Sequence, residues 1–172
     1  MDISMTIIWI FAIVVGCAIA AVVVKKSNND GKAKTKYDER QLRARGDSFK
    51  YGFYATLIAN AIFMALSSSG LTNILGYTTF FISILIGVIA QFTHAIFHDA
   101  YIGLNTNMKK YSLFMAIIMI FNLGFGILGI IDGEIIRDGV LGIPFINFLC
   151  AGLFFILAAE LAIKAYLDKK EK

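Results

Sequence analysis

Two histidines near the end of an apolar run form the strongest candidate for chemistry in this sequence. His94 and His98 stand four residues apart and therefore share one helix face, and Asp99 follows directly. Imidazoles at this spacing can both reach one metal ion, and a carboxylate could complete a site that suits zinc better than magnesium. The same group could instead relay a proton, because histidine titrates near neutral pH.

Glu160 is a further candidate, since it is a carboxylate inside the last apolar run. Ionisable groups within a membrane span are functional candidates by default. However, Lys164 stands four residues later, in the order that favours an ion pair along one helix. We weigh an ion site of His94, His98, Asp99 and Glu160 against side chains satisfied by water, head groups and Lys164. The second interpretation is favoured, because the sequence has neither HExxH nor a second His/Cys cluster that would support a metal site.

The sequence contains no motif for catalysis or nucleotide binding. A Walker loop, a nucleophile elbow and a paired-carboxylate arrangement are all missing. Cys17 and Cys150 stand deep in apolar runs and are expected to behave as small buried hydrophobes. We therefore predict a protein that is not an enzyme and has no cofactor.

The composition indicates an integral membrane protein. Hydrophobic residues make up 58% of the 172 residues and charged residues 16%, against about 25% charged residues in soluble domains. The net charge of +4 arises from Lys and Arg that flank apolar runs. The positive-inside rule explains this pattern without a nucleic-acid partner.

Five apolar runs are long enough to cross most of a hydrocarbon core of about 30 Å as helices. The start MDISM has no basic residue, so the first run is predicted to be an uncleaved span rather than a signal peptide. The distribution of Lys and Arg places the N-terminus outside and the C-terminus in the cytoplasm. The predicted fold is an all-α integral membrane helical bundle of five transmembrane helices, multi-pass in the cell (cytoplasmic) membrane. The runs are roughly 6–24, 51–66, 77–97, 111–131 and 141–163.

The expected organisation has four parts. Residues 1–24 form the first transmembrane helix with a short outer N-terminus, 25–50 a basic cytosolic loop with a short amphipathic helix, 51–163 a four-helix transmembrane bundle and 164–172 a basic cytosolic tail. Within the basic loop, the polar stretch 25–36 is expected to be a flexible linker. A helix follows, with Thr35 or Asp38 as N-cap.

Small and polar residues recur at helical spacing in these runs and predict faces that pack on other helices. The predicted packing stripes are Ala12/Gly16/Ala20, Gly52/Thr56/Asn60 and Gly126/Gly129. A further small and polar stripe, Ser83/Gly87/Gln91, shares the helix face of His94 and His98.

Two segments, KYDERQLRARGDSFKYGF and HDAYIGLN, carry a family resemblance. They resemble small multi-span membrane proteins of Gram-positive bacteria (Firmicutes), which share a cytosolic Asp-Glu-Arg-Gln motif before one span and an Asp-Ala-Tyr turn after a later one. Here these motifs begin at Asp38 and Asp99. The resemblance implies a bacterial membrane protein and supplies no catalytic or binding residue, because the function of the group is not known.

The sequence favours a non-enzymatic interaction or regulatory protein with the cytosolic loop 36–50 as its contact surface. The alternative is a small transporter or ion-handling protein using the His94/His98/Glu160 region. Expected partners are the lipid bilayer, anionic head groups at the basic loop, and a second copy or another protein. The candidate contact residues are Asp38, Glu39, Arg40, Gln41, Arg43 and Arg45.

Overall fold

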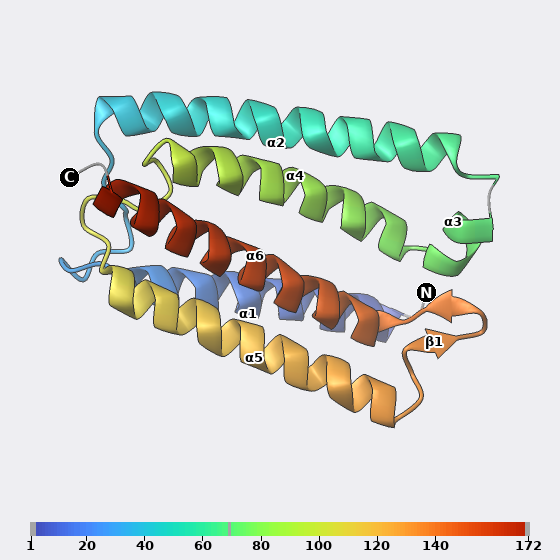
Figure 1. Ribbon diagram of the computed structural model, residues 1–172. Helices are drawn as coiled ribbons and strands as arrows, with labels where there is room; N and C mark the ends of the chain where they lie inside the picture. The colour runs from blue at the N-terminus through green and yellow to red at the C-terminus, as the bar shows by residue number, and fades with distance from the viewer. Residues whose placement is uncertain (1–2, 69, 171–172) are drawn as a thin grey trace. The chain divides into compact units, whose positions relative to one another are not determined.

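The protein is all-α apart from one short hairpin (Figure 1). The computed structural model describes residues 3–68 and 70–170, with side chains from residue 14 onwards. The helices are α1 (Ile3–Ser27), α2 (Glu39–Ala65), α3 (Gly70–Leu75), α4 (Thr78–Phe97), α5 (Met108–Ile131) and α6 (Ile143–Lys170). The strands β1 (Ile136–Arg137) and β2 (Val140–Leu141) form an antiparallel hairpin.

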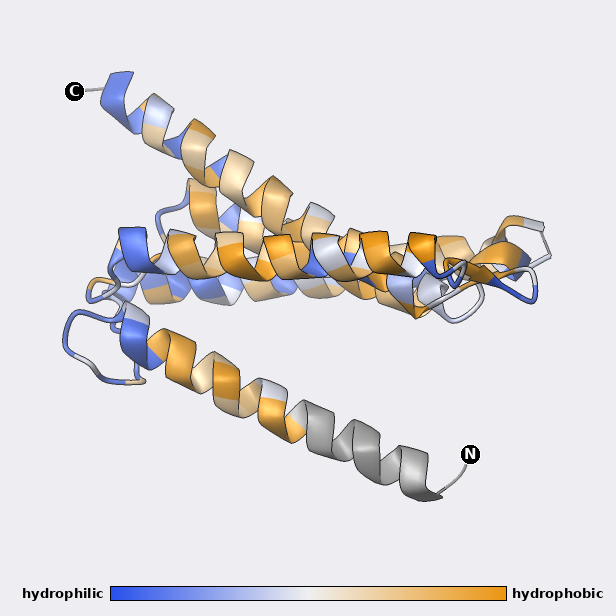
Figure 2. Cartoon of the chain, turned by 90° about the horizontal axis from the view of Figure 1, so that it is seen from below, coloured by the Kyte–Doolittle hydropathy of each residue, from blue (hydrophilic) through white to orange (hydrophobic). Residues whose placement is uncertain are grey.

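Within the described residues, three helices, α4, α5 and α6, are long and apolar enough to cross a membrane. Figure 2 shows apolar residues along most of the helical length, with hydrophilic residues gathered at helix ends and in loops. This pattern is that of a membrane protein, because a helix satisfies all its backbone hydrogen bonds internally and can lie in lipid.

The chain folds into two compact units. Unit 1 comprises Met1–Tyr37 and Ile102–Phe114, and unit 2 comprises Asp38–Tyr101 and Met115–Lys172. Unit 1 therefore holds α1 and the first turns of α5. Unit 2 holds the other helices, the hairpin and the rest of α5.

In unit 2, α4 lies between α2 and α6 (Figure 1) and packs most extensively on α2. The backbones of α2 and α4 approach closely at Gly52 and Gly87, both buried. A Cβ on Gly52 would lie 2.9 Å from the carbonyl oxygen of Gly87, and one on Gly87 would lie 2.7 Å from that of Gly52. Only glycine allows the two backbones to come so near. The predicted packing of the Gly52 stripe on another helix is confirmed, and Gly87 is the residue that it meets.

The glycines of α5 pack on α6 as predicted. A Cβ on Gly126 would meet the Phe148 ring at 2.9 Å, and one on Gly129 would overlap Pro144. Pro144 stands in the first turn of α6, where its missing N–H costs no helical hydrogen bond.

The predicted stripe on α1 has no such neighbour in the described residues. Gly16 and Ala20 are exposed, and a Cβ on Gly16 would meet nothing within 4 Å. The side chain of Ala12 lies outside the described part of the chain.

Two boundaries differ from the sequence prediction. The expected short amphipathic helix and the second span are one helix, α2, because no proline interrupts residues 39–65. Likewise α6 continues to Lys170, so the expected tail from residue 164 is helical. The segments between the predicted spans, 67–76 and 132–140, contain α3 and most of the hairpin, whose last residue, Leu141, was expected to begin the last span.

Candidate functional site

The start of α2 is fixed by a capping box, as the Asp38 alternative predicted. The Asp38 carboxylate accepts a hydrogen bond of 2.7 Å from the Gln41 backbone N–H, and Gln41 Oε1 accepts one of 3.2 Å from the Asp38 N–H. These two bonds satisfy donors that a helix N-terminus otherwise leaves unpaired. Thr35, the other candidate cap, lies before the helix.

The same segment grips the turn that follows α4. Gln41 is buried, and its amide nitrogen donates a 2.7 Å hydrogen bond to the Asp99 carbonyl oxygen. Arg45 donates to the Ala100 carbonyl at 3.3 Å. The Asp-Glu-Arg-Gln and Asp-Ala-Tyr segments, far apart in sequence, therefore meet in unit 2.

Asp99 carries the charge of this contact. Its backbone has φ +56°, a left-handed conformation that Asp tolerates better than most residues. Its carboxylate lies 3.0 Å from Lys164 Nζ on α6 and 3.6 Å from an Arg40 guanidinium nitrogen on α2. Asp99 thus joins α2, α4 and α6 at one end of unit 2.

The predicted ion pair between Glu160 and Lys164 is wrong. Lys164 pairs with Asp99 and with Asp168. Glu160 instead accepts a 2.5 Å hydrogen bond from the Thr93 hydroxyl of α4. The cause is tertiary: α4 packs against the α6 face that carries Glu160, so Thr93 takes the place of the lysine.

His94 and His98 stack on each other and on α2. Their ring centroids are 4.0 Å apart with an interplanar angle of 12°, and the Tyr51 ring stacks on His94 at 4.6 Å. His98 Nδ1 lies 2.8 Å from the His94 carbonyl oxygen. The stack forms one wall of an open groove of about 530 Å³ between α2 and α4.

The four candidate metal ligands do not converge. His94 stacks on Tyr51 and His98 on His94, Asp99 pairs with Lys164, and Glu160 accepts a hydrogen bond from Thr93. Among the described residues, no group of three or more His, Cys, Asp or Glu side chains is placed to hold a metal ion. His94 Nδ1 and Glu160 Oε2 are buried side-chain atoms that have no hydrogen-bond partner among the residues that the structure describes.

The candidate contact residues divide into two sets. Gln41 is buried and Arg45 half-buried, and both hold the turn after α4. Glu39, Arg40 and Arg43 are all exposed. Sequence reasoning could not separate the two sets, because all lie within about two helical turns.

Unit 1 contains a second junction, made by residues 27–36 with 103–107. Asn105 is its centre: its amide nitrogen donates to the Asp30 carboxylate at 3.1 Å, and its amide oxygen accepts from the Lys36 N–H at 2.8 Å. The Leu104 N–H donates to the Lys36 carbonyl at 2.9 Å. The polar stretch 25–36 is therefore an ordered, hydrogen-bonded segment, where a flexible linker was expected.

Asp30 is held as a carboxylate in this junction. The backbone N–H of Lys32 lowers its pKa most, and hydrogen bonds from Asn105 and Lys36 lower it further. Lys36 Nζ lies 3.2 Å from the carboxylate. The sequence composition could not predict this hydrogen-bond network, because its residues are types that are common in any loop.

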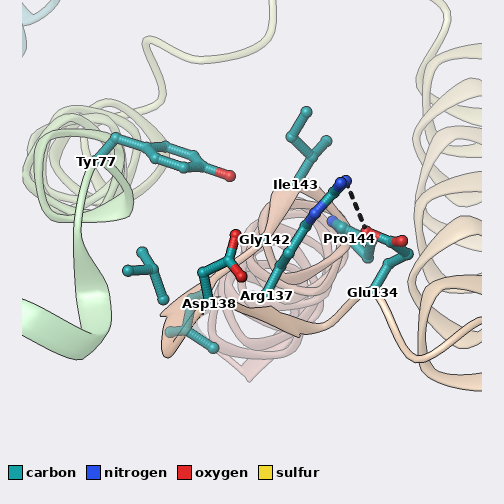
Figure 3. Close-up of a pocket in the computed structure, with 9 residues that line it drawn as sticks. Tyr77, Glu134, Arg137, Asp138, Gly142, Ile143 and Pro144 are labelled. Carbon is teal, nitrogen blue, oxygen red and sulfur yellow. Dashed lines mark hydrogen bonds and ion pairs between the residues drawn. The ribbon is translucent and has the colours of Figure 1, made fainter.

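A pocket of about 290 Å³ lies at the hairpin of unit 2 (Figure 3). The Tyr77 ring faces the hairpin across it, and Arg137 pairs with Glu134 at 3.5 Å. Asp138, with φ +53°, turns the hairpin. The ionic side chains here are exposed and two of them neutralise each other, so the pocket suggests no chemistry.

Comparisons with protein-family models, with curated proteins and with solved structures find no match.

Proposed function

We propose that this chain is a non-enzymatic membrane protein that acts by binding another protein through the first turns of α2. The observation that carries the proposal is the two-sided character of this helix start. Gln41 and Ser48 are buried on one side. Leu42 and Phe49, on the other side, are 57% and 54% exposed. An exposed apolar stripe on a fixed helix is a typical docking surface.

The charges beside this stripe indicate the kind of partner. Arg43 forms no ion pair within the described residues, and Arg40 is exposed although it lies near Asp99. An apolar patch with an acidic rim on the partner would complement Leu42 and these two arginines. We name Glu39, Arg40, Leu42, Arg43 and Phe49 the α2 contact face.

The proposal includes five membrane spans with the N-terminus outside. The apolar α1 and the second half of α2 would join α4, α5 and α6 as spans. Lys and Arg concentrate in residues 25–50, 98–110 and 164–172, so these segments are placed in the cytoplasm. The chain would then be a multi-pass protein of the cytoplasmic membrane, with its basic loop close to anionic head groups.

We also propose that the chain belongs with the small multi-span proteins of Gram-positive bacteria that it resembles. The contact between the two motif segments supports this assignment. The Gln41 side chain of the first motif donates a hydrogen bond to the Asp99 carbonyl oxygen of the second. Both motifs therefore belong to one structural contact.

Site-specific photo-cross-linking tests the contact face. A photoreactive amino acid in place of Leu42 is expected to trap one defined protein in cells that make this protein. The same probe at Tyr166, a similarly exposed residue of α6, serves as the control. Arg43→Glu with the probe at Leu42 should abolish the adduct by reversing the local charge.

The outcomes are distinct. An adduct of twice the chain mass would identify a second copy as the partner. No adduct at Leu42, or the same adducts at Leu42 and Tyr166, would contradict the proposed contact face.

Ion handling is the second candidate, favoured by the two buried atoms without partners, His94 Nδ1 and Glu160 Oε2. Against it, these groups face different neighbours of α4, with His94 on Tyr51 and Glu160 on Thr93. Zinc titration of the purified protein beside a His94→Ala/His98→Ala variant tests the metal form. Equal, weak zinc binding by both proteins would contradict the hypothesis that the histidines bind a metal ion.

A further inference from the structure

The groove between α2 and α4 has polar side chains at one end and aliphatic side chains at the other, as a phospholipid has a polar head group and acyl chains. One stripe of α2 runs from Asp47 through Tyr51 and Tyr54 to Ile58, with successive residues three or four positions apart. Tyr51, Tyr54, Ile58 and the α4 residues Ala90 and Phe97 line the groove itself. The lining passes from hydroxyls and imidazoles to aliphatic carbon along the helix.

The side chains that line this groove are exposed on the surface of the protein. Tyr54 and Ile58 are each 60% exposed and Phe97 is 39% exposed. Exposed aromatic residues at one end of an apolar span are typical of the membrane interface, where the ring meets the acyl chain and the hydroxyl meets the head group. The apolar end of the groove would then lie at acyl-chain depth.

Positive charge lies beyond the tyrosines. Lys50 and Arg43 are seven residues apart and therefore share a face of α2, next to the stripe that ends at the groove. His98 lines the rim, with its Nδ1 held by the His94 carbonyl oxygen at 2.8 Å.

Asp47 is an acidic group at the same end of the groove as Lys50. Lys50 holds it at 2.8 Å and is the main cause of its lowered pKa, with a smaller contribution from the nearby imidazoles. Arg43 therefore keeps an unmatched charge at this end. Its guanidinium makes no ion pair with any residue that the structure describes.

We propose that this groove is a binding site for an anionic phospholipid, with one acyl chain along Tyr54, Ile58 and Ala90 and the phosphate beside Arg43 and Lys50. The inference rests on the membrane placement given under the proposed function, and it deepens the expected contact with anionic head groups into a defined site. It shares Arg43 with the α2 contact face but does not use Leu42 or Phe49, so lipid and protein partner would compete for Arg43 alone.

The test compares two lipids on delipidated protein in detergent. Native mass spectrometry would count bound phosphatidylglycerol and phosphatidylcholine of identical acyl chains. Phosphatidylglycerol is expected to bind more tightly, and Arg43→Gln and Lys50→Gln should each weaken it about five-fold, at about 1 kcal/mol per basic residue near the head group. Lys169→Gln, in the last turn of α6, is the matched control and should have no effect.

A second variant tests the chain-binding part. Ala55→Trp places a large ring in the groove and should reduce binding of both lipids, whereas Ala61→Trp, exposed on α2 outside the groove, should not. Phosphatidylglycerol with very short chains should bind much more weakly than the long-chain lipid. Equal binding of short and long chains would mean a head-group contact only and would overturn the groove.

Two further results would overturn the proposal: equal affinity for the two lipids in the native protein, or unchanged lipid binding in all the variants. Either result together with an intact cross-link at Leu42 would leave the proposed function standing. Loss of the cross-link with preserved lipid selectivity would contradict the proposed function and leave the lipid site standing.

Discussion

At the residue scale, Gly87 shows how little space separates α2 from α4. Gly52 and Thr56 stand opposite it, and any Cβ on Gly87 must displace a backbone carbonyl. Gly124, within α5, would have nothing within 4 Å of an added methyl group. The two glycines therefore provide a matched pair.

We expect Gly87→Ala to destabilise the protein by about 1–3 kcal/mol, the usual cost of overpacking. Gly124→Ala should leave stability unchanged or raise it, because alanine is the better helix former by about 1 kcal/mol. Thermal unfolding of both variants in the same detergent measures the difference. Equal midpoints for the two would contradict the packing of α2 on α4.

Asp30 gives the junction of unit 1 a predictable response to acid. Its folded-state pKa is lowered from 3.8 by the Lys32 N–H, Asn105 and Lys36. A carboxyl group with a depressed pKa stabilises the folded state in full above its unfolded value, and this contribution is lost as the pH falls through the folded pKa. The junction should therefore loosen below pH 3.8 and be unaffected at neutral pH.

Hydrogen exchange at the Asn29 and Leu104 amides, corrected for intrinsic rates, follows this loosening. Both amides donate to backbone carbonyls across the junction, at 2.7 and 2.9 Å. In an Asp30→Asn variant the acid-dependent change in protection should disappear. If the variant kept the same acid response, Asp30 would not be its source.

At the element scale, Gln41 couples the start of α2 to the end of α4. Its side chain closes the capping box and also pairs the Asp99 carbonyl, so its removal should cost more than an ordinary cap. An N-terminal cap is worth about 1 kcal/mol, and the hydrogen bond from the buried Gln41 amide adds about 0.5–1.5 kcal/mol.

Gln41→Ala should therefore lower stability by about 2 kcal/mol or more. Glu39→Ala, two positions earlier and on the exposed side, should change it by less than about 0.5 kcal/mol. Chemical or thermal unfolding in detergent compares them. A Gln41→Ala protein as stable as the Glu39→Ala protein would show that the turn after α4 does not depend on this contact.

The ion pairs around Asp99 also belong to this scale. Asp99 is 45% exposed, and Arg40 still more so, so screening by water limits the worth of their pair. Lys164 is the better placed partner, at 3.0 Å and only 19% exposed. These pairs orient the ends of α2, α4 and α6 more than they stabilise them.

At the scale of the whole molecule, the proposed topology makes one direct prediction. In a variant with Cys17 and Cys150 replaced by serine, Lys34→Cys should be closed to a membrane-impermeant maleimide added to intact cells. Asp138→Cys, in the hairpin that the same topology assigns to the outside, should be labelled. The reason is the concentration of Lys and Arg in residues 25–50.

Permeabilised cells provide the control, because both cysteines should then react. Strong labelling of Lys34→Cys in intact cells would reverse the proposed orientation. Labelling of neither residue in intact cells would contradict the assignment of the hairpin to the outside.

The sequence alone determined where most of the long helices lie and which glycines of α2 and α5 face a neighbouring helix. Apolar runs placed α4 within a residue or two of its observed bounds, and Asp38 with Gln41 predicted the start of α2, because both features depend on residues close together in the chain. The small-residue stripes likewise identified Gly52, Gly126 and Gly129 as contact positions. Helical periodicity fixes which residues share a face, whatever the neighbour is.

The tertiary structure alone decided the partners of the polar side chains. Sequence spacing joined Lys164 to Glu160, whereas the fold joins Lys164 to Asp99 and Glu160 to Thr93. It also turned the histidines towards Tyr51. A local pattern ranks only neighbours along one helix, while a hydrogen bond or ion pair forms with whichever group a packed helix brings within about 3 Å. That choice depends on how α4 lies between α2 and α6, which no single segment encodes.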